Sequence, residues 1–153
     1  MNINIIAVGN IKEKFFADAC GEYAKRLSRF GKLNITEIKE CRGNSDMQDI
    51  NAEGALILKK IPSGSYIVAL CVEGKQKSSE ELAELISDAG IDGFGSITFI
   101  IGGSDGLSDT VKNAAHLRLS FSKMTFPHQL MRVFLLEQIY RGFKINNNES
   151  YHK

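Results

Sequence analysis

The sequence is poor in cysteine and histidine, and it lacks the spacings that usually hold a metal. It has three of each in 153 residues, with no CxxC pair, and they are Cys20, Cys41, Cys71, His116, His128 and His152. An odd number of widely separated cysteines is typical of reduced thiols in a cytoplasm and unlike a disulfide framework or a zinc site. We therefore expect a cytoplasmic protein without a bound metal.

Long hydrophobic runs are also missing. No apolar stretch reaches the length of a membrane span, and the first ten residues, MNINIIAVGN, lack the basic region of a signal peptide. This start is predicted to be a strand. Without repeats, low-complexity tracts or a long linker, the chain is expected to form a single domain over residues 1–153, large enough to bury a core of its own.

The formal net charge of +1 conceals an uneven distribution of charge. Acidic side chains dominate residues 73–110, whereas basic side chains dominate residues 111–153. A basic last third is compatible with an anionic partner such as RNA. Solvated faces of mixed charge are the commoner explanation of such a split.

The stretch ITFIIGGSDGLS, residues 97–108, predicts a ligand site. Its apolar start suits a strand buried on both faces, its three glycines allow close approach to the backbone, and Ser108 is a good N-cap for a following helix. Such a strand, loop and helix form binding sites at the carboxyl edge of α/β sheets. The loop fits neither GxxxxGK[ST] nor GxGxxG and carries Asp105, which favours a neutral or cationic ligand over a phosphate. A plain tight turn is the alternative interpretation.

Strand and helix patterns alternate along the whole chain, which predicts an α/β fold. Five strands are expected at residues 3–8, 33–38, 66–72, 97–101 and 116–119, the third ending in a glycine turn at 73–75. Ser45 or Asp46 is expected to begin a helix that runs to about Lys60, and Ser78 or Ser79 the next one. Topology rules alone favour an unknotted, doubly wound sheet.

The last helix, expected at residues 127–144, has apolar residues on two faces. One face carries Leu136 and Ile139, and the other carries Leu130 and Phe134. Such a helix needs two packing partners, the sheet and a second subunit. Arg132 lies within the first face and is costly there unless it forms an ion pair, for example with Glu137 of a partner chain, or contacts a substrate.

Three segments and the chain end together resemble the ribosomal RNA large-subunit methyltransferase H family of the SPOUT class. They are VALCVEGK (68–75), FIIGGSDGLS (99–108), SFSKMTFPHQLMRVFLLEQIYRGFKI (120–145) and the terminal YHK. The resemblance covers the whole chain. It implies one SPOUT domain, an α/β sheet flanked by helices with a C-terminal trefoil knot, and a homodimer. It also implies S-adenosylmethionine as cofactor and a pseudouridine in helix 69 of 23S ribosomal RNA as substrate, methylated at N3 within the assembled ribosome.

The same resemblance implies a set of site residues. The cofactor pocket would use Leu70, Gly102, Phe121, Ser122, Lys123, Met124, Thr125 and Phe126. His152 is the candidate general base, because an imidazole titrates near neutral pH, and Arg132, Arg141 and Tyr151 are candidates for orienting the nucleotide. The alternatives without a function are core packing for Met124 and Phe126 and a frayed tail for His152.

Two other functions fit parts of the sequence. A flavodoxin-type nucleotide module shares the strand–helix alternation, although Asp105 and the lack of a Ser/Thr-rich phosphate loop count against it. A non-catalytic dimeric ribosome-binding factor could keep the same fold. Thermal shifts with S-adenosylmethionine, FMN and ATP distinguish the flavodoxin-type module from a methyltransferase. A methyl-transfer assay on ribosomes distinguishes the non-catalytic factor from an enzyme.

Overall fold

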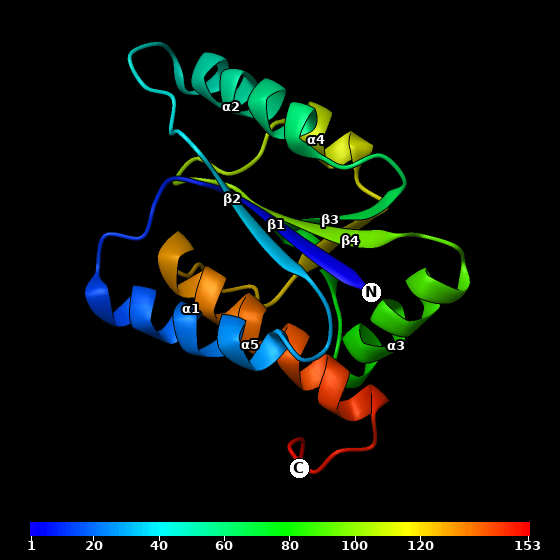
Figure 1. Cartoon of the computed structure of the whole chain (residues 1–153). Helices are drawn as coiled ribbons and strands as arrows, with labels where there is room; N and C mark the ends of the chain where they lie inside the picture. Colours follow the sequence, from blue (N-terminus) through cyan, green and yellow to red (C-terminus); the bar gives the residue numbers. More distant parts are fainter.

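A single parallel sheet organises the computed structural model, which describes residues 1–153. Its strands lie in the order β2-β1-β4-β3-β5, and every adjacent pair is parallel (Figure 1). Their bounds are β1 Asn2–Val8, β2 Leu33–Ile38, β3 Ser65–Gln76, β4 Ser96–Ile101 and β5 Leu117–Ser120. The predicted α/β class is confirmed.

Helices cover both faces of the sheet. On one face lie α1 (Lys14–Leu27), α3 (Ser79–Ile91) and α5 (His128–Asn146), with α5 packed against both of its neighbours (Figure 1). On the other face lie α2 (Asp46–Lys60) and the short α4 (Asp109–Ala114). None of the five helices combines the length and apolarity that crossing a membrane requires.

Successive side chains of the central strands point to opposite faces of the sheet, and this alternation creates two hydrophobic cores. In β1, Ile5 belongs to the larger core beneath α1, α3 and α5, whereas its neighbour Ile6 belongs to the smaller core beneath α2 and α4. In β4, Phe99 and Ile100 divide in the same way, and both are fully buried. Burial on both faces explains the continuous apolar runs of these strands.

Serine side chains begin three of the helices. Ser45 and Ser78 each form a capping box with the residue three positions on, and Ser108 accepts a hydrogen bond from the Val111 backbone N–H. These contacts satisfy N–H groups that have no partner within the helix. The α5 helix begins at His128, with Pro127 as its N-cap instead of its first residue.

The predicted end of the third strand is wrong, because β3 continues through residues 73–75 to Gln76. Leu70 and Lys75 of β3 both register with Leu119 of β5, so the segment between them bulges out of the pairing with β5. An added Cβ on Gly74 would lie 2.7 Å from the carbonyl carbon of Arg118. Gly74 therefore permits two backbones to approach closely instead of forming a turn.

Candidate functional site: a cavity at the carboxyl ends of β3 and β4

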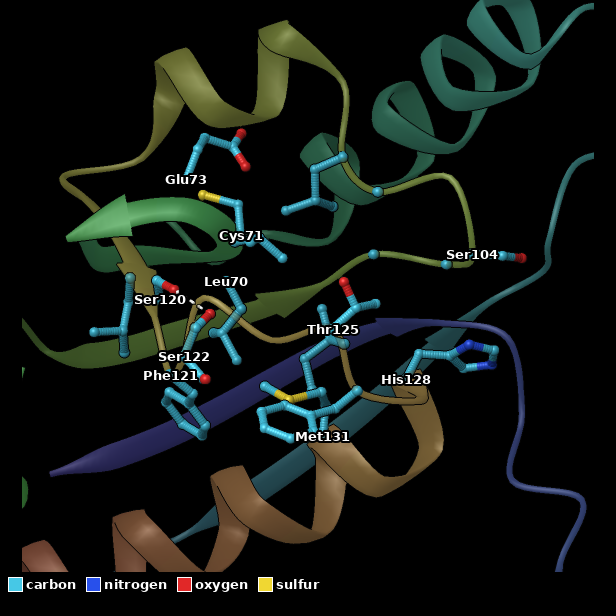
Figure 2. A pocket seen from close by; sticks show the side chains of 18 of the residues that line it. Leu70, Cys71, Glu73, Ser104, Ser120, Phe121, Ser122, Thr125, His128 and Met131 are labelled. Carbon is cyan, nitrogen blue, oxygen red and sulfur yellow. Dashed lines mark hydrogen bonds between the residues drawn. The ribbon is translucent and has the colours of Figure 1, made fainter. Parts of the chain in front are cut away.

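A cavity of about 650 Å³ opens where β3, β4 and the segment before α5 meet (Figure 2). Its wall consists of residues 70–73, 101–107, 119–122 and 124–128, together with Lys112 and Met131. Figure 2 shows Leu70 in the middle of the cavity, with the Phe121 and Met131 side chains on the side of α5. The cavity thus lies at the carboxyl edge of the sheet, the edge at which the glycine loop predicts a ligand site.

The loop after β4 is held in a compact form by its glycines. The Gly106 N–H donates to the Gly103 carbonyl oxygen at 3.1 Å, and Gly106 has a φ of 85°. An added Cβ on Gly102 would lie 2.6 Å from the carbonyl oxygen of Gly106. A side chain at position 102 would therefore push the loop apart, and the bare backbone forms this part of the cavity wall.

Serine side chains shape the segment between β5 and α5. The Ser120 hydroxyl donates to the Ser122 carbonyl oxygen at 2.9 Å (Figure 2), and the Met124 N–H donates to the Ser122 hydroxyl at 3.0 Å. Farther along, the Phe126 ring packs edge-on against Phe134 of α5, with ring centroids 5.4 Å apart. These contacts direct residues 120–126 along the cavity instead of away from it.

The charges in the cavity differ between its two ends. At the β3 end, Lys112 forms an ion pair with Glu73, and this hydrogen bond lowers the pKa of Glu73 below its usual value. The neighbouring Cys71 thiol has a raised pKa, mainly because it is buried. At the other end, the Ser104 hydroxyl donates to Glu40 at 3.1 Å, and Asp105 lines the cavity without a polar side-chain partner.

Seven of the eight residues predicted for cofactor binding line this cavity. They are Leu70, Gly102, Phe121, Ser122, Met124, Thr125 and Phe126, whereas Lys123 lies outside the lining. Lining residues outside the predicted set include Cys71, Glu73, Lys112, His128 and Met131. The sequence did hold a signal for Cys71 and Glu73, because both belong to the family segment VALCVEGK. Lys112 belongs to no motif that could have indicated it.

The three other site candidates near the chain end form a separate cluster. Arg141 donates to Glu137 at 2.6 Å, and the Tyr151 hydroxyl donates to the same carboxylate at 3.1 Å. Burial, reinforced by the charge of Glu137, raises the pKa of Tyr151 to about 12. None of these side chains lines the larger cavity.

His152 is held in this cluster by both ring nitrogens. Its Nδ1 lies 3.1 Å from a guanidinium nitrogen of Arg141, and its Nε2 lies 2.7 Å from Glu80. A guanidinium only donates and a carboxylate only accepts, so Nδ1 accepts from Arg141 and Nε2 carries the proton toward Glu80. The C-terminal tail is therefore docked on α3 and α5 and is not frayed.

A smaller cavity of about 390 Å³ lies between the cluster and the larger cavity. It shares Leu119, Phe121 and Phe126 with the larger one, and Glu137 of the cluster forms part of its wall. The two candidate regions are thus neighbours, separated by apolar side chains.

Arg132 contacts the protein's own sheet. Its side chain is 6% exposed, and it donates to Glu37 of β2 at 2.7 Å and to the Gly9 carbonyl oxygen at 3.2 Å. The expected ion pair is confirmed, but its partner is Glu37 of the same chain and not Glu137 of a second chain, since Glu137 pairs with Arg141 along α5. Burial leaves Arg132 almost no surface to offer a nucleotide.

Comparison with known proteins identifies relatives along the full chain. Residues 1–152 match a family described as "Predicted SPOUT methyltransferase". The chain is 54% identical to "Ribosomal RNA large subunit methyltransferase H" of Clostridium novyi (strain NT), with all of both chains covered. It is 51% identical to proteins of the same name from Bifidobacterium animalis subsp. lactis and Clostridioides difficile, again with full coverage of both chains.

The fold has a relative among solved structures. A probable methylase family protein from Haemophilus influenzae superposes with a TM-score of 0.56 at 13% sequence identity. The alignment covers 99% of this chain and 70% of that chain. At this identity the likeness supports the arrangement of the sheet and helices.

Proposed function

Because this chain belongs to the SPOUT methyltransferase family and is a ribosomal RNA methyltransferase, we propose that its methyl donor is S-adenosylmethionine. We further propose that the acceptor is N3 of a pseudouridine in helix 69 of 23S ribosomal RNA, methylated in the assembled ribosome of the cytoplasm. Family membership excludes the flavodoxin-type alternative.

The observation that carries the donor assignment is the cavity at the carboxyl edge of the sheet. Its volume of about 650 Å³ lies in the range of small-molecule sites, and Leu70, Phe121 and Met131 offer apolar surface for an adenine ring. The bare backbone at Gly102 allows close approach of a ligand. Nothing in S-adenosylmethionine is a phosphate, which is compatible with the carboxylate of Asp105.

When bound, S-adenosylmethionine supplies a methyl group on a sulfonium whose sulfur leaves as a neutral thioether. The chain's own residues then have two tasks, which are to hold the reactants in line and to accept the N3 proton of the acceptor. We assign the second task, acceptance of the N3 proton, to His152. Because both of its ring nitrogens are occupied, the acceptor has to displace Arg141 from Nδ1 before that nitrogen can take a proton.

The assignment to His152 predicts that His152→Ala lowers turnover by about a hundredfold, the usual lower range for loss of a general base. Binding of S-adenosylmethionine should stay unchanged, because His152 lies outside the cavity. The matched control is Lys153→Ala in the same tail, with full turnover expected. Wild-type turnover in His152→Ala would remove this residue from the mechanism.

We also propose a homodimer formed through the N-terminal half of α5. Phe134 is 37% exposed on the face of α5 that turns away from the sheet, and Met124 before the helix is 72% exposed. Contiguous apolar patches are typical of surfaces that bind a partner, and Phe134 packs against Phe126. A second copy would give α5 the second packing partner that its apolar pattern demands.

A C-terminal trefoil knot is part of the same proposal. Its support is membership of the SPOUT methyltransferase family, of which the knot is the expected feature. RNA binding would rely on the dimer surface, where the exposed side chain of Lys25 in α1 is available for a phosphate.

The donor assignment is tested by thermal shift of the purified protein. We expect S-adenosylmethionine to raise the midpoint of unfolding in a concentration-dependent way, because it binds the folded state alone. FMN and ATP serve as controls and should leave the midpoint unchanged. Stabilisation by FMN or ATP without stabilisation by S-adenosylmethionine would overturn the assignment.

A further inference from the structure

Asp105 is the one carboxylate in the cavity whose charge is not neutralised. Three formally charged side chains line the cavity, and they are Glu73, Lys112 and Asp105. Lys112 forms an ion pair with Glu73, so their charges cancel locally. Asp105 forms no ion pair and no side-chain hydrogen bond, and it is exposed at the rim. The protein therefore presents a net negative charge to whatever enters this end.

Two other carboxylates lie close to this end. Glu40 accepts the Ser104 hydroxyl next to Asp105 but is itself paired with Arg42 at 2.8 Å, whereas the buried Glu53 accepts the Cys41 N–H and has no ion pair. The pKa of Glu53 is raised by burial first, and then by the charges of Glu40 and Asp105. These groups are thus close enough to interact, and a cation at Asp105 would relieve their repulsion.

The inner cavity has the opposite character. Leu70, Ile101 and Leu119 are buried and apolar, and Met131 and Phe121 extend the same wall. An amphiphilic ligand would place its flat apolar portion against these side chains and its charged portion at the wet rim. In S-adenosylmethionine the adenine is the flat portion, and the methionyl end carries an α-ammonium group.

We propose that Asp105 binds the α-ammonium group of the donor's methionyl end and so selects a nucleoside that carries the aminocarboxypropyl chain over other adenosine compounds. This inference rests on the proposed donor. It makes Asp105 a specificity-determining residue and gives a physical reason for a carboxylate in a glycine loop that would otherwise suit a phosphate.

The charge of Asp105 can be separated from its place in the backbone. Asp105 is the third residue of the turn closed by the hydrogen bond from the Gly106 N–H to the Gly103 carbonyl oxygen. Asparagine suits such turn positions as well as aspartate does, so Asp105→Asn removes the charge and keeps the turn. Asp109→Asn is the matched control, because it removes a nearby charge that does not line the cavity.

The test is isothermal titration of the full chain with three ligands. S-Adenosylmethionine and S-adenosylhomocysteine both carry the α-ammonium group, whereas 5′-methylthioadenosine lacks the whole aminocarboxypropyl chain. In Asp105→Asn we expect the Kd of the first two ligands to rise about tenfold, as for the loss of one partly screened charge pair. The Kd of 5′-methylthioadenosine should change less than about twofold, and Asp109→Asn should bind all three ligands like the wild type.

Three results would overturn the inference. Equal weakening of all three ligands would indicate a structural role in the loop, and unchanged binding of all three would remove Asp105 from recognition. Weakening of S-adenosylmethionine alone would place the sulfonium, and not the ammonium, at Asp105. If the wild type binds none of the ligands, the proposed donor fails and this inference fails with it, which distinguishes that outcome from the others.

Discussion

Arg132 shows how one buried charge connects the sheet to the wall of the site. Its guanidinium joins Glu37 at the end of β2 and the Gly9 carbonyl oxygen just after β1. The preceding residue in α5, Met131, lines the cavity. The ion pair therefore fixes the first turns of α5 against the edge strand, although Arg132 itself does not reach the cavity.

Removal of the carboxylate should expose the cost of this buried charge. Glu37→Ala leaves the Arg132 guanidinium, whose Nε already lacks a hydrogen-bond partner, without its counter-ion. We expect the free energy of unfolding to fall by about 1–3 kcal/mol in urea titrations. The control is Glu22→Ala, which breaks the exposed pair with Arg26 and should cost less than about 0.5 kcal/mol. Equal losses in the two variants would show that burial of Arg132 adds nothing to the energetic cost of breaking its ion pair.

At the scale of elements, the pairing of β3 with β5 determines the shape of the site. The bulge of β3 places Cys71, Val72 and Glu73 along the cavity, and β5 leads directly into the segment that closes it. At Gly74 the backbone of β5 leaves no room for a Cβ. Any side chain at this position would therefore disturb the pairing of the two strands.

Gly74→Ala should destabilise the fold, because its Cβ would lie 2.7 Å from the Arg118 carbonyl carbon and 2.8 Å from the Arg118 carbonyl oxygen. We expect a loss of about 1–3 kcal/mol, the usual cost of overpacking. Gly21→Ala in α1 is the matched control, since nothing lies within 4 Å of its added Cβ. That change should stabilise the protein by about 0.5–1 kcal/mol, as alanine does in a helix. The expected result is that the two substitutions change the free energy of unfolding in opposite directions.

Local patterns predict most elements well because the responsible forces act over short stretches. The strand at residues 33–38 has its predicted bounds, and Ser45, Ser78 and Ser108 begin helices as their capping chemistry indicates. The end of β3 could not be predicted in this way. A glycine between polar residues is typical of a turn, and the strand that Gly74 accommodates lies far along the chain.

Prediction of the site depended on the resemblance to a family more than on spacing. The glycine loop alone indicated a binding edge, whereas Phe121 and Thr125 entered only as parts of a family motif. The ion pair between Glu73 and Lys112 and the placement of His128 join different elements, so no spacing reveals them. Arg132 was recognised as a buried charge, but its partner Glu37 lies on a distant strand.

At the scale of the whole molecule, the exposed apolar side chains around the two cavities suggest an incomplete surface. Phe134 lines the smaller cavity and packs against Phe126, which lines both. In the proposed dimer this surface is covered by a second copy, so the substrate would approach along the edge of the subunit interface.

Phe134→Glu should convert the dimer to a monomer, because it places a charge in the apolar face of α5. Sedimentation velocity measures the change, and circular dichroism checks that the fold is kept. Ile91→Glu is the control, since Ile91 is 79% exposed at the end of α3 and should leave the dimer intact. A wild-type protein that sediments as a monomer would contradict the proposed assembly.

The most direct test of the account is transfer of a tritiated methyl group from S-adenosylmethionine to ribosomes that lack the modification. We predict that label enters the large-subunit RNA of assembled ribosomes at one nucleotide, recovered as N3-methylpseudouridine, and that an isolated fragment containing helix 69 takes up little. Absence of label from the ribosome, or equal labelling of the isolated fragment, would contradict the account.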